Sequence, residues 1–71
     1  MSNLLNKNKI PYWFELVTTI QIDIGKLNTK KILENLNKTG LGNYYKIFGN
    51  YIKIFISTDE INSQLIKQII S

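Results

Sequence analysis

Few side chains in this 71-residue sequence could carry acid–base or metal chemistry. The chain has no histidine and no cysteine, which excludes imidazole bases, histidine or cysteine metal ligands, and disulfide bonds. Its five acids are Glu15, Asp23, Glu34, Asp59 and Glu60. A metal-dependent nuclease needs carboxylates that converge on one site, and nothing in this spacing brings them together. We therefore expect no enzyme, no metal site and no cofactor.

Lysines dominate the charged residues. Nine lysines and no arginine stand against the five acids, which gives a net charge of +4 at pH 7. This balance suits a polyanionic partner such as nucleic acid, although ordinary solubility accounts for it as readily. No apolar run approaches the roughly 20 residues that span a bilayer, and the first residues lack the apolar stretch of a signal peptide. We expect a soluble protein with no membrane partner.

Residues 44–55, YYKIFGNYIKIF, combine lysines and aromatic rings in two strand-like runs. Gly49 followed by Asn50 predicts a hairpin with a two-residue type II′ turn. This turn would place Phe48 opposite Tyr51, Lys46 opposite Lys53, and Tyr44 opposite Phe55. One face of the hairpin is then apolar and is expected to pack under helices. That face carries Tyr45, Ile47, Ile52, Ile54 and Ile56.

The opposite face of this hairpin predicts a nucleic-acid-binding surface. Like charges that face each other on a sheet are destabilising, and an anion between Lys46 and Lys53 would reverse that effect. Aromatic rings that stack on bases, beside ammonium groups that contact phosphates, are typical of nucleic-acid-binding sheets. Two other interpretations are aromatic pairing that only stabilises the hairpin, and a surface covered by a protein partner. The predicted binding residues are Lys7, Lys9, Trp13, Tyr44, Lys46, Phe48, Tyr51, Lys53 and Phe55. For Trp13, a simple core or edge position is an equal alternative.

Hydrophobic periodicity predicts an α+β fold with the order β-α-β-β-α. Residues 12–24 alternate as one long strand with a bulge or bend near Thr18 and Thr19, which could switch the faces of its first half. A helix is expected over 29–39, begun by Asn28 and ended by Gly40. The last helix is expected to begin with a capping box that joins Ser57 and Glu60.

We expect both helices to pack on one face of a small antiparallel or mixed sheet, with a ferredoxin-like fold as an alternative. If the first two strands run in a ferredoxin-like way, the right-handed crossover rule places the last strand between them. Residues 1–10 are expected to form a flexible basic arm that cannot pack a core. Residues 11–71 form the single predicted domain.

Residues 7–71 resemble the C-terminal part of a LAGLIDADG homing-endonuclease repeat. The stretches with the closest similarity are Thr39-Gly40-Leu41-Gly42 and the run IKIFIS at 52–57. The resemblance implies a twisted sheet that binds DNA or, as in splicing maturases, intron RNA. It also implies a helix before the first strand that forms the dimer interface and ends in an acidic metal ligand. The family's usual pattern buries the residue two after the loop glycine, which would place Tyr44 inward instead. No such helix or acid is evident here, so we expect a degenerate, inactive relative.

The sequence therefore predicts a catalytically inactive protein that binds structured RNA, favoured over DNA, within a ribonucleoprotein. Asparagine, isoleucine and lysine are abundant and alanine is absent, as in very AT-rich coding sequences, which suggests a mitochondrion or another AT-rich organelle, with the cytoplasm as the alternative. The RNA would then be ribosomal or intronic. The alternative is a protein-interaction module, such as a viral inhibitor or an assembly subunit, that uses an exposed strand edge. A third interpretation is a fragment of a split endonuclease.

Overall fold

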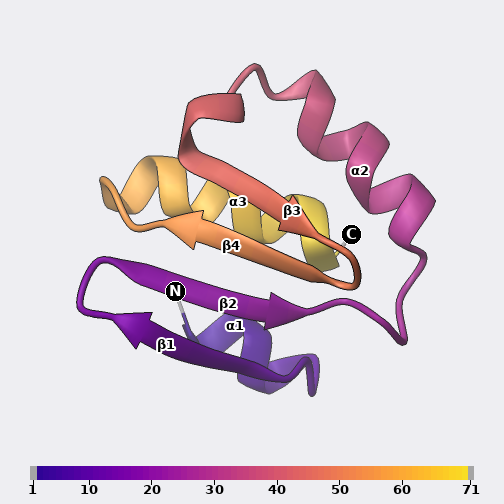
Figure 1. The fold of residues 1–71 in the computed structure, drawn as a ribbon, viewed down its shortest axis with the longest axis horizontal. Helices are drawn as coiled ribbons and strands as arrows, with labels where there is room; N and C mark the ends of the chain where they lie inside the picture. The colour runs from indigo at the N-terminus through magenta and orange to yellow at the C-terminus, as the bar shows by residue number, and fades with distance from the viewer. Residues whose placement is uncertain (1, 71) are drawn as a thin grey trace.

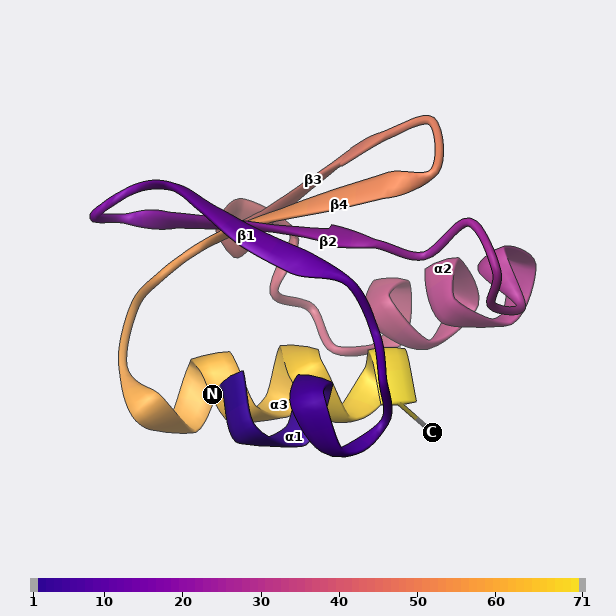
Figure 2. The same ribbon diagram turned by 90° about the horizontal axis from the view of Figure 1, so that it is seen from below.

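The computed structural model describes residues 2–70, in which two strand pairs are separated and flanked by helices (Figure 1). The helices are α1 (Ser2–Lys7), α2 (Thr29–Lys38), a 3₁₀ helix η1 (Gly42–Tyr44) and α3 (Asp59–Ile70). The strands are β1 (Tyr12–Leu16), β2 (Thr19–Asp23), β3 (Tyr45–Phe48) and β4 (Tyr51–Phe55). They form one antiparallel sheet in the order β1-β2-β4-β3. The α-helices lie together on one side of this sheet (Figure 2), so the predicted α+β class is confirmed.

Residues 12–24 form a hairpin, and the prediction of one long strand is wrong. β1 and β2 pair with each other around a turn at Val17 and Thr18. Both turn residues are β-branched, a type that favours strands, so the sequence carries no Gly, Asn or Pro signal for this turn. A bulge does occur, but at Glu15, where the register shifts between Phe14 and Leu16.

The central position of β4 is as predicted. This last strand lies between β2 and β3, and it is antiparallel to both. β2 and β3 are therefore parallel to each other without being neighbours, and α2 forms the crossover between them. The predicted turn between β3 and β4 also has the expected backbone, because Gly49 has a φ of 54° and the register pairs Phe48 with Tyr51.

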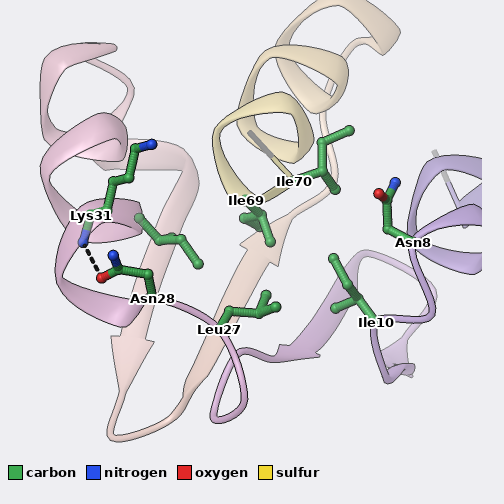
Figure 3. Close-up of a pocket in the computed structure, with 8 residues that line it drawn as sticks. Asn8, Ile10, Leu27, Asn28, Lys31, Ile69 and Ile70 are labelled. Carbon is green, nitrogen blue, oxygen red and sulfur yellow. Dashed lines mark hydrogen bonds between the residues drawn. The ribbon is translucent and has the colours of Figure 1, made fainter.

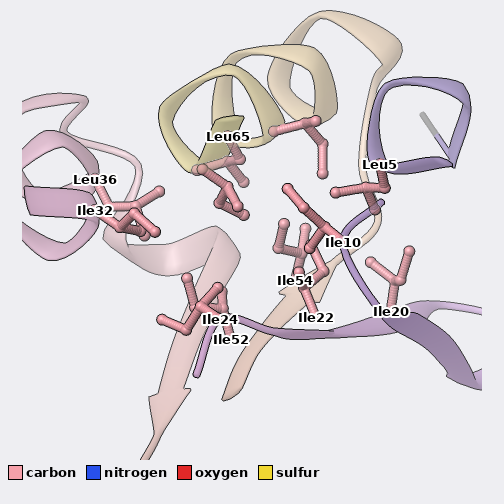
Figure 4. Packing of buried hydrophobic residues seen from close by; sticks show 12 residues of the cluster. Leu5, Ile10, Ile20, Ile22, Ile24, Ile32, Leu36, Ile52, Ile54 and Leu65 are labelled. Carbon is pink, nitrogen blue, oxygen red and sulfur yellow. The ribbon is translucent and has the colours of Figure 1, made fainter. Parts of the chain in front are cut away.

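A core rich in isoleucine fills the space between the sheet and the helices (Figure 4). The side chains that the sheet contributes are fully buried, and they are Ile20, Ile22, Ile52 and Ile54. They alternate along β2 and β4, so every second residue of these central strands faces the helices. Each of the three α-helices also contributes buried side chains, namely Leu5, Ile32, Leu36, Leu65, Ile66 and Ile69. Ile47 faces the same side from the edge strand β3 but stays 37% exposed, so its predicted place in the core is wrong.

The chain before Pro11 belongs to this core, which corrects the prediction of a polar arm unable to pack one. Residues Ser2–Lys7 form α1, and the Leu5 side chain is fully buried. Ile10, just after the helix, is 6% exposed. Asparagines and lysines flank these apolar residues, so the sequence gives no clear signal for a helix. A helix this short is stabilised by packing rather than by its own propensity.

Local signals fix the ends of α2 and α3. The Asn28 side chain accepts a hydrogen bond from the backbone N–H of Lys31 at 3.2 Å, as predicted for the N-cap residue that precedes α2. Gly40 follows α2 with a φ of 71°. The predicted capping box of α3 is wrong, because the Thr58 hydroxyl accepts from the N–H of Ile61 at 3.3 Å. Ser57 is held instead by Asn62, whose side chain bonds both its N–H and its carbonyl oxygen.

Truncation of Leu5 tests whether α1 is part of the domain. Because this side chain is fully buried, Leu5→Ala is expected to lower the free energy of unfolding by about 2–4 kcal/mol. Leu16→Ala is the matched control, since Leu16 is 67% exposed and its truncation should change stability by less than about 0.5 kcal/mol. Urea unfolding followed by circular dichroism measures both. If Leu5→Ala changed the free energy of unfolding as little as Leu16→Ala, α1 would not pack as described.

Candidate functional site

The side of the sheet away from the helices is uncovered, and we call it the open face (Figure 2). Residues that lie opposite each other on neighbouring strands share a face, so the register defines the rows of this surface. The first row crosses all four strands and consists of Trp13, Gln21, Lys53 and Lys46. The second row consists of Asp23, Tyr51 and Phe48. The third consists of Leu16, Thr19 and Phe55.

The bulge in β1 decides which of its residues reach the open face. Phe14 lies opposite Ile20, on the helix side, whereas Leu16 lies opposite Thr19, on the open face. Glu15 is the extra residue between them, and a bulge of this kind redirects a side chain. The bulge thus switches Leu16 to the open face, which the alternation pattern alone would have assigned to the helix side.

Aromatic rings are the most prominent groups on this surface. Trp13, Phe48, Tyr51 and Phe55 are each between 39% and 46% exposed. The rings of Trp13 and Tyr51 meet edge to face, with centroids 5.4 Å apart. Phe48 lies beneath two ammonium groups, at 5.5 Å from Lys46 Nζ and 5.3 Å from Lys53 Nζ, which is within cation–π range. Each of these aromatic residues nevertheless keeps between 39% and 46% of its surface exposed.

Glu15 neutralises one of the two lysines. Its Oε2 atom lies 2.7 Å from Lys53 Nζ and accepts a hydrogen bond from Gln21 Nε2 at 2.8 Å. These contacts, led by the hydrogen bond from Lys53, lower the pKa of the Glu15 carboxyl below its ordinary value. Lys46 lies directly opposite Lys53, and it forms no ion pair within residues 2–70.

The open face is consequently neutral in formal charge. It carries two lysines, Lys46 and Lys53, and two carboxylates, Glu15 and Asp23. The net charge of +4 of the whole chain is therefore carried by residues outside this face. The simple inference that opposed lysines need an external anion is weakened, because Glu15 already supplies one from within the chain.

The structure brings most of the predicted site residues together, but not all. Trp13, Lys46, Phe48, Tyr51, Lys53 and Phe55 lie on the open face. Tyr44 does not, because it ends η1 rather than pairing with Phe55, and it packs against the core. Lys7 ends α1 and Lys9 lies in the turn after it, and α1 is on the helix side of the sheet (Figure 2).

Two polar residues of the site, Glu15 and Gln21, were not among the predicted residues. The alternation of the strand places both residues on the same side as Trp13, so their face could have been predicted from the sequence. The contact between Glu15 and Lys53, however, depends on the pairing of β2 with β4 and on the bulge in β1. Neither feature has a recognisable local sequence signature.

A small cavity lies elsewhere, where the end of α1, the start of α2 and the end of α3 meet (Figure 3). Its volume is about 170 Å³. Isoleucine and leucine side chains line most of it, with Asn8, Asn28 and Lys31 as the polar members. It contains none of the residues predicted to bind nucleic acid and no carboxylate, so the chemistry of the open face does not extend into it.

Comparisons with known proteins do not assign this chain to a family. A scan against protein-family models, a search of curated proteins and a search of solved structures each gave no match. Within the described residues, no three carboxylates gather as a metal site. Over the same residues, none of the helices has both the length and the apolar character needed to cross a bilayer. The site must therefore be interpreted from its own geometry.

The lowered pKa of Glu15 makes the contribution of its ion pair dependent on pH. A carboxylate whose pKa is depressed by folding adds stability above its unfolded pKa, and this is lost as the pH falls through the folded value. We expect wild type and Glu15→Gln to differ in urea midpoint by a constant amount between pH 7 and pH 5. The difference should shrink below about pH 4.3. It should also shrink in 1 M NaCl at pH 7, because the pair is exposed and screened by salt. A difference that persisted unchanged to pH 2 would contradict the ion pair.

Proposed function

We propose that this protein binds RNA with unpaired bases on the open face, chiefly by stacking. The observation that carries the proposal is the set of half-exposed rings on one uncovered side of a four-stranded sheet, namely Trp13, Phe48, Tyr51 and Phe55. Bases stack on such rings irrespective of sequence. Bases inside a duplex are already stacked and paired, so the face suits single-stranded loops, bulges and ends.

The balance of forces at this face favours stacking over charge. Each stacked base is worth about 1–3 kcal/mol, and the face offers several rings. Lys46 is the one lysine of the face without an ion pair in the described part of the chain. Part of the stacking free energy offsets the entropic cost of ordering the RNA on binding. A dissociation constant on the order of 10–100 μM follows for a short oligonucleotide, with tighter binding only inside a larger ribonucleoprotein.

We place this activity in a catalytically inactive relative of the LAGLIDADG endonucleases. α1 precedes β1, where the resemblance implies the helix with the acidic metal ligand, and α1 contains no acidic residue. Ribosomal or intron RNA of an AT-rich organelle, such as a mitochondrion, is the ligand we propose on the basis of composition. These assignments depend on the resemblance and the composition, whereas the RNA-binding proposal depends on the open face.

The single tryptophan of the chain provides a direct test. Because Trp13 lies on the open face beside Tyr51, a stacked base should quench its fluorescence. We expect single-stranded RNA decamers to quench it in a saturable titration, and a duplex of the same sequence to do so at least tenfold less effectively. Phe48→Ala should weaken binding by about 5- to 100-fold. The matched control is Lys30→Gln, which removes an exposed charge on α2 and should bind as wild type.

Salt dependence completes this test. With one phosphate contact, the logarithm of the binding constant should fall with the logarithm of the salt concentration at a slope near −0.7. Absence of quenching, equal binding of duplex and single strand, or indifference to Phe48→Ala would each refute the proposal.

The exposed edge strands favour a second candidate function, a protein-interaction module. β3 is paired on one side only, and its Ile47 and Phe48 are 37% and 46% exposed. An unpaired edge can accept a strand from a partner or from a second copy. The bulge at Glu15 disrupts the other edge, β1, so β3 is the regular edge of the two.

Light scattering after size exclusion separates the two functions. If β3 is an assembly edge between copies, the protein should elute as a dimer or larger species at about 100 μM. Ile47→Pro should then return it to the monomer, because proline removes an N–H from the edge strand. Ile47→Thr, which keeps the N–H, is the control. A monomer at all concentrations would argue against assembly of copies through this edge.

A further inference from the structure

Glu15 occupies the position that a phosphate group of a ligand would need. Its Oε2 atom lies 2.7 Å from Lys53 Nζ, which is the distance of a charge-assisted hydrogen bond. The side chain reaches Lys53 on β4 from β1, across Gln21 of the intervening strand. Glu15 is also the residue at which the register of β1 against β2 shifts, so the side chain that contacts Lys53 comes from the bulge. An oxygen anion thus already satisfies the ammonium group of Lys53.

The opposed lysines would otherwise form a phosphate site. Lys46 and Lys53 face each other on neighbouring strands, and both ammonium groups lie within 5.5 Å of the Phe48 ring centroid. A phosphate placed between them could contact both lysines beside the Phe48 ring. Glu15 contacts one lysine of this pair and leaves the other, Lys46, without an ion-pair partner in residues 2–70.

We propose that Glu15 is a specificity-determining residue that keeps phosphate away from Lys53, so that the open face holds its ligand by the bases and by a single phosphate contact at Lys46. This inference rests on the proposed RNA binding and deepens it. A polyanion without bases would have to displace the Glu15 carboxylate before it could contact Lys53 as well as Lys46. The negative charge of Glu15 would also repel it. The selected ligand class is therefore single-stranded RNA with accessible bases, as opposed to duplexes and other polyanions that offer only charge.

The substitution Glu15→Gln isolates this effect. Glutamine has the same shape and still offers a neutral acceptor oxygen, but it removes the negative charge that pairs with Lys53. We expect single-stranded RNA to bind the variant about three- to tenfold more tightly at low salt. The salt slope should steepen from near −0.7 to near −1.4, which corresponds to one additional phosphate contact. Heparin, a polyanion without bases, should gain measurable affinity for the variant.

Two control variants make the result specific. Glu34→Gln changes the net charge by the same amount, but Glu34 lies on α2 on the helix side of the sheet (Figure 2), so the affinity and the slope should stay those of wild type. In the double variant with Glu15→Gln and Lys46→Gln, the slope should return to near −0.7, because one lysine of the pair is left. Circular dichroism and urea unfolding confirm that each variant is folded before the titrations.

The failure of this inference is distinguishable from failure of the proposed function. If wild type binds single-stranded RNA and Glu15→Gln has the same affinity and slope, the role of Glu15 is refuted while RNA binding stands. If neither protein shows quenching of Trp13 by RNA, but heparin binds Glu15→Gln and not wild type, Glu15 does exclude anions and the RNA function is refuted. If Glu34→Gln reproduces the gain, net charge is the cause and the inference is refuted.

Discussion

The structure depends on the pairing of β2 with β4, whose isoleucines all point to one side. Ile20 lies opposite Ile54 and Ile22 opposite Ile52, and each of these side chains is fully buried. Pleated strands direct alternate side chains to opposite faces, so burial of these residues fixes which face the helices cover. The helices of residues 2–70 all pack on that face (Figure 2). These helices leave the other face uncovered, and the aromatic rings on it stay partly exposed.

The open face combines apolar rings with a local charge balance. Trp13 and Tyr51 pack edge to face, and Phe48 lies under two ammonium groups, yet these rings stay partly exposed. Its charges pair within the chain, because Glu15 meets Lys53. The surface therefore differs from a basic patch, where affinity follows the number of lysines. In the RNA binding that we propose, the free energy would come mainly from contacts between bases and rings and only in small part from charge.

The errors of the sequence-based prediction have a common physical origin. The turn at Val17 and Thr18 consists of strand-forming residues, so its position is imposed by the pairing of β1 with β2 rather than by local preference. α1 is a helix of six residues, too short to be stable alone, and it exists because Leu5 is buried against the other helices. By contrast, the turn at Gly49 and the start of α2 at Asn28 were predicted correctly, because each depends on one residue and its own backbone.

The sequence by itself determined the α+β class, the register of the hairpin formed by β3 and β4, and the separation of its isoleucines from its lysines and exposed rings. These features follow from a period of two and from a glycine with positive φ, both of which are local. Only the tertiary structure decided that Trp13 joins these rings, that Tyr44 leaves them, and that Glu15 neutralises Lys53. Tyr44 leaves because it ends η1 and not a strand. The other two outcomes require β2 and β4, which are distant in the sequence, to pair in one register, and burial of the shared isoleucine core favours this register.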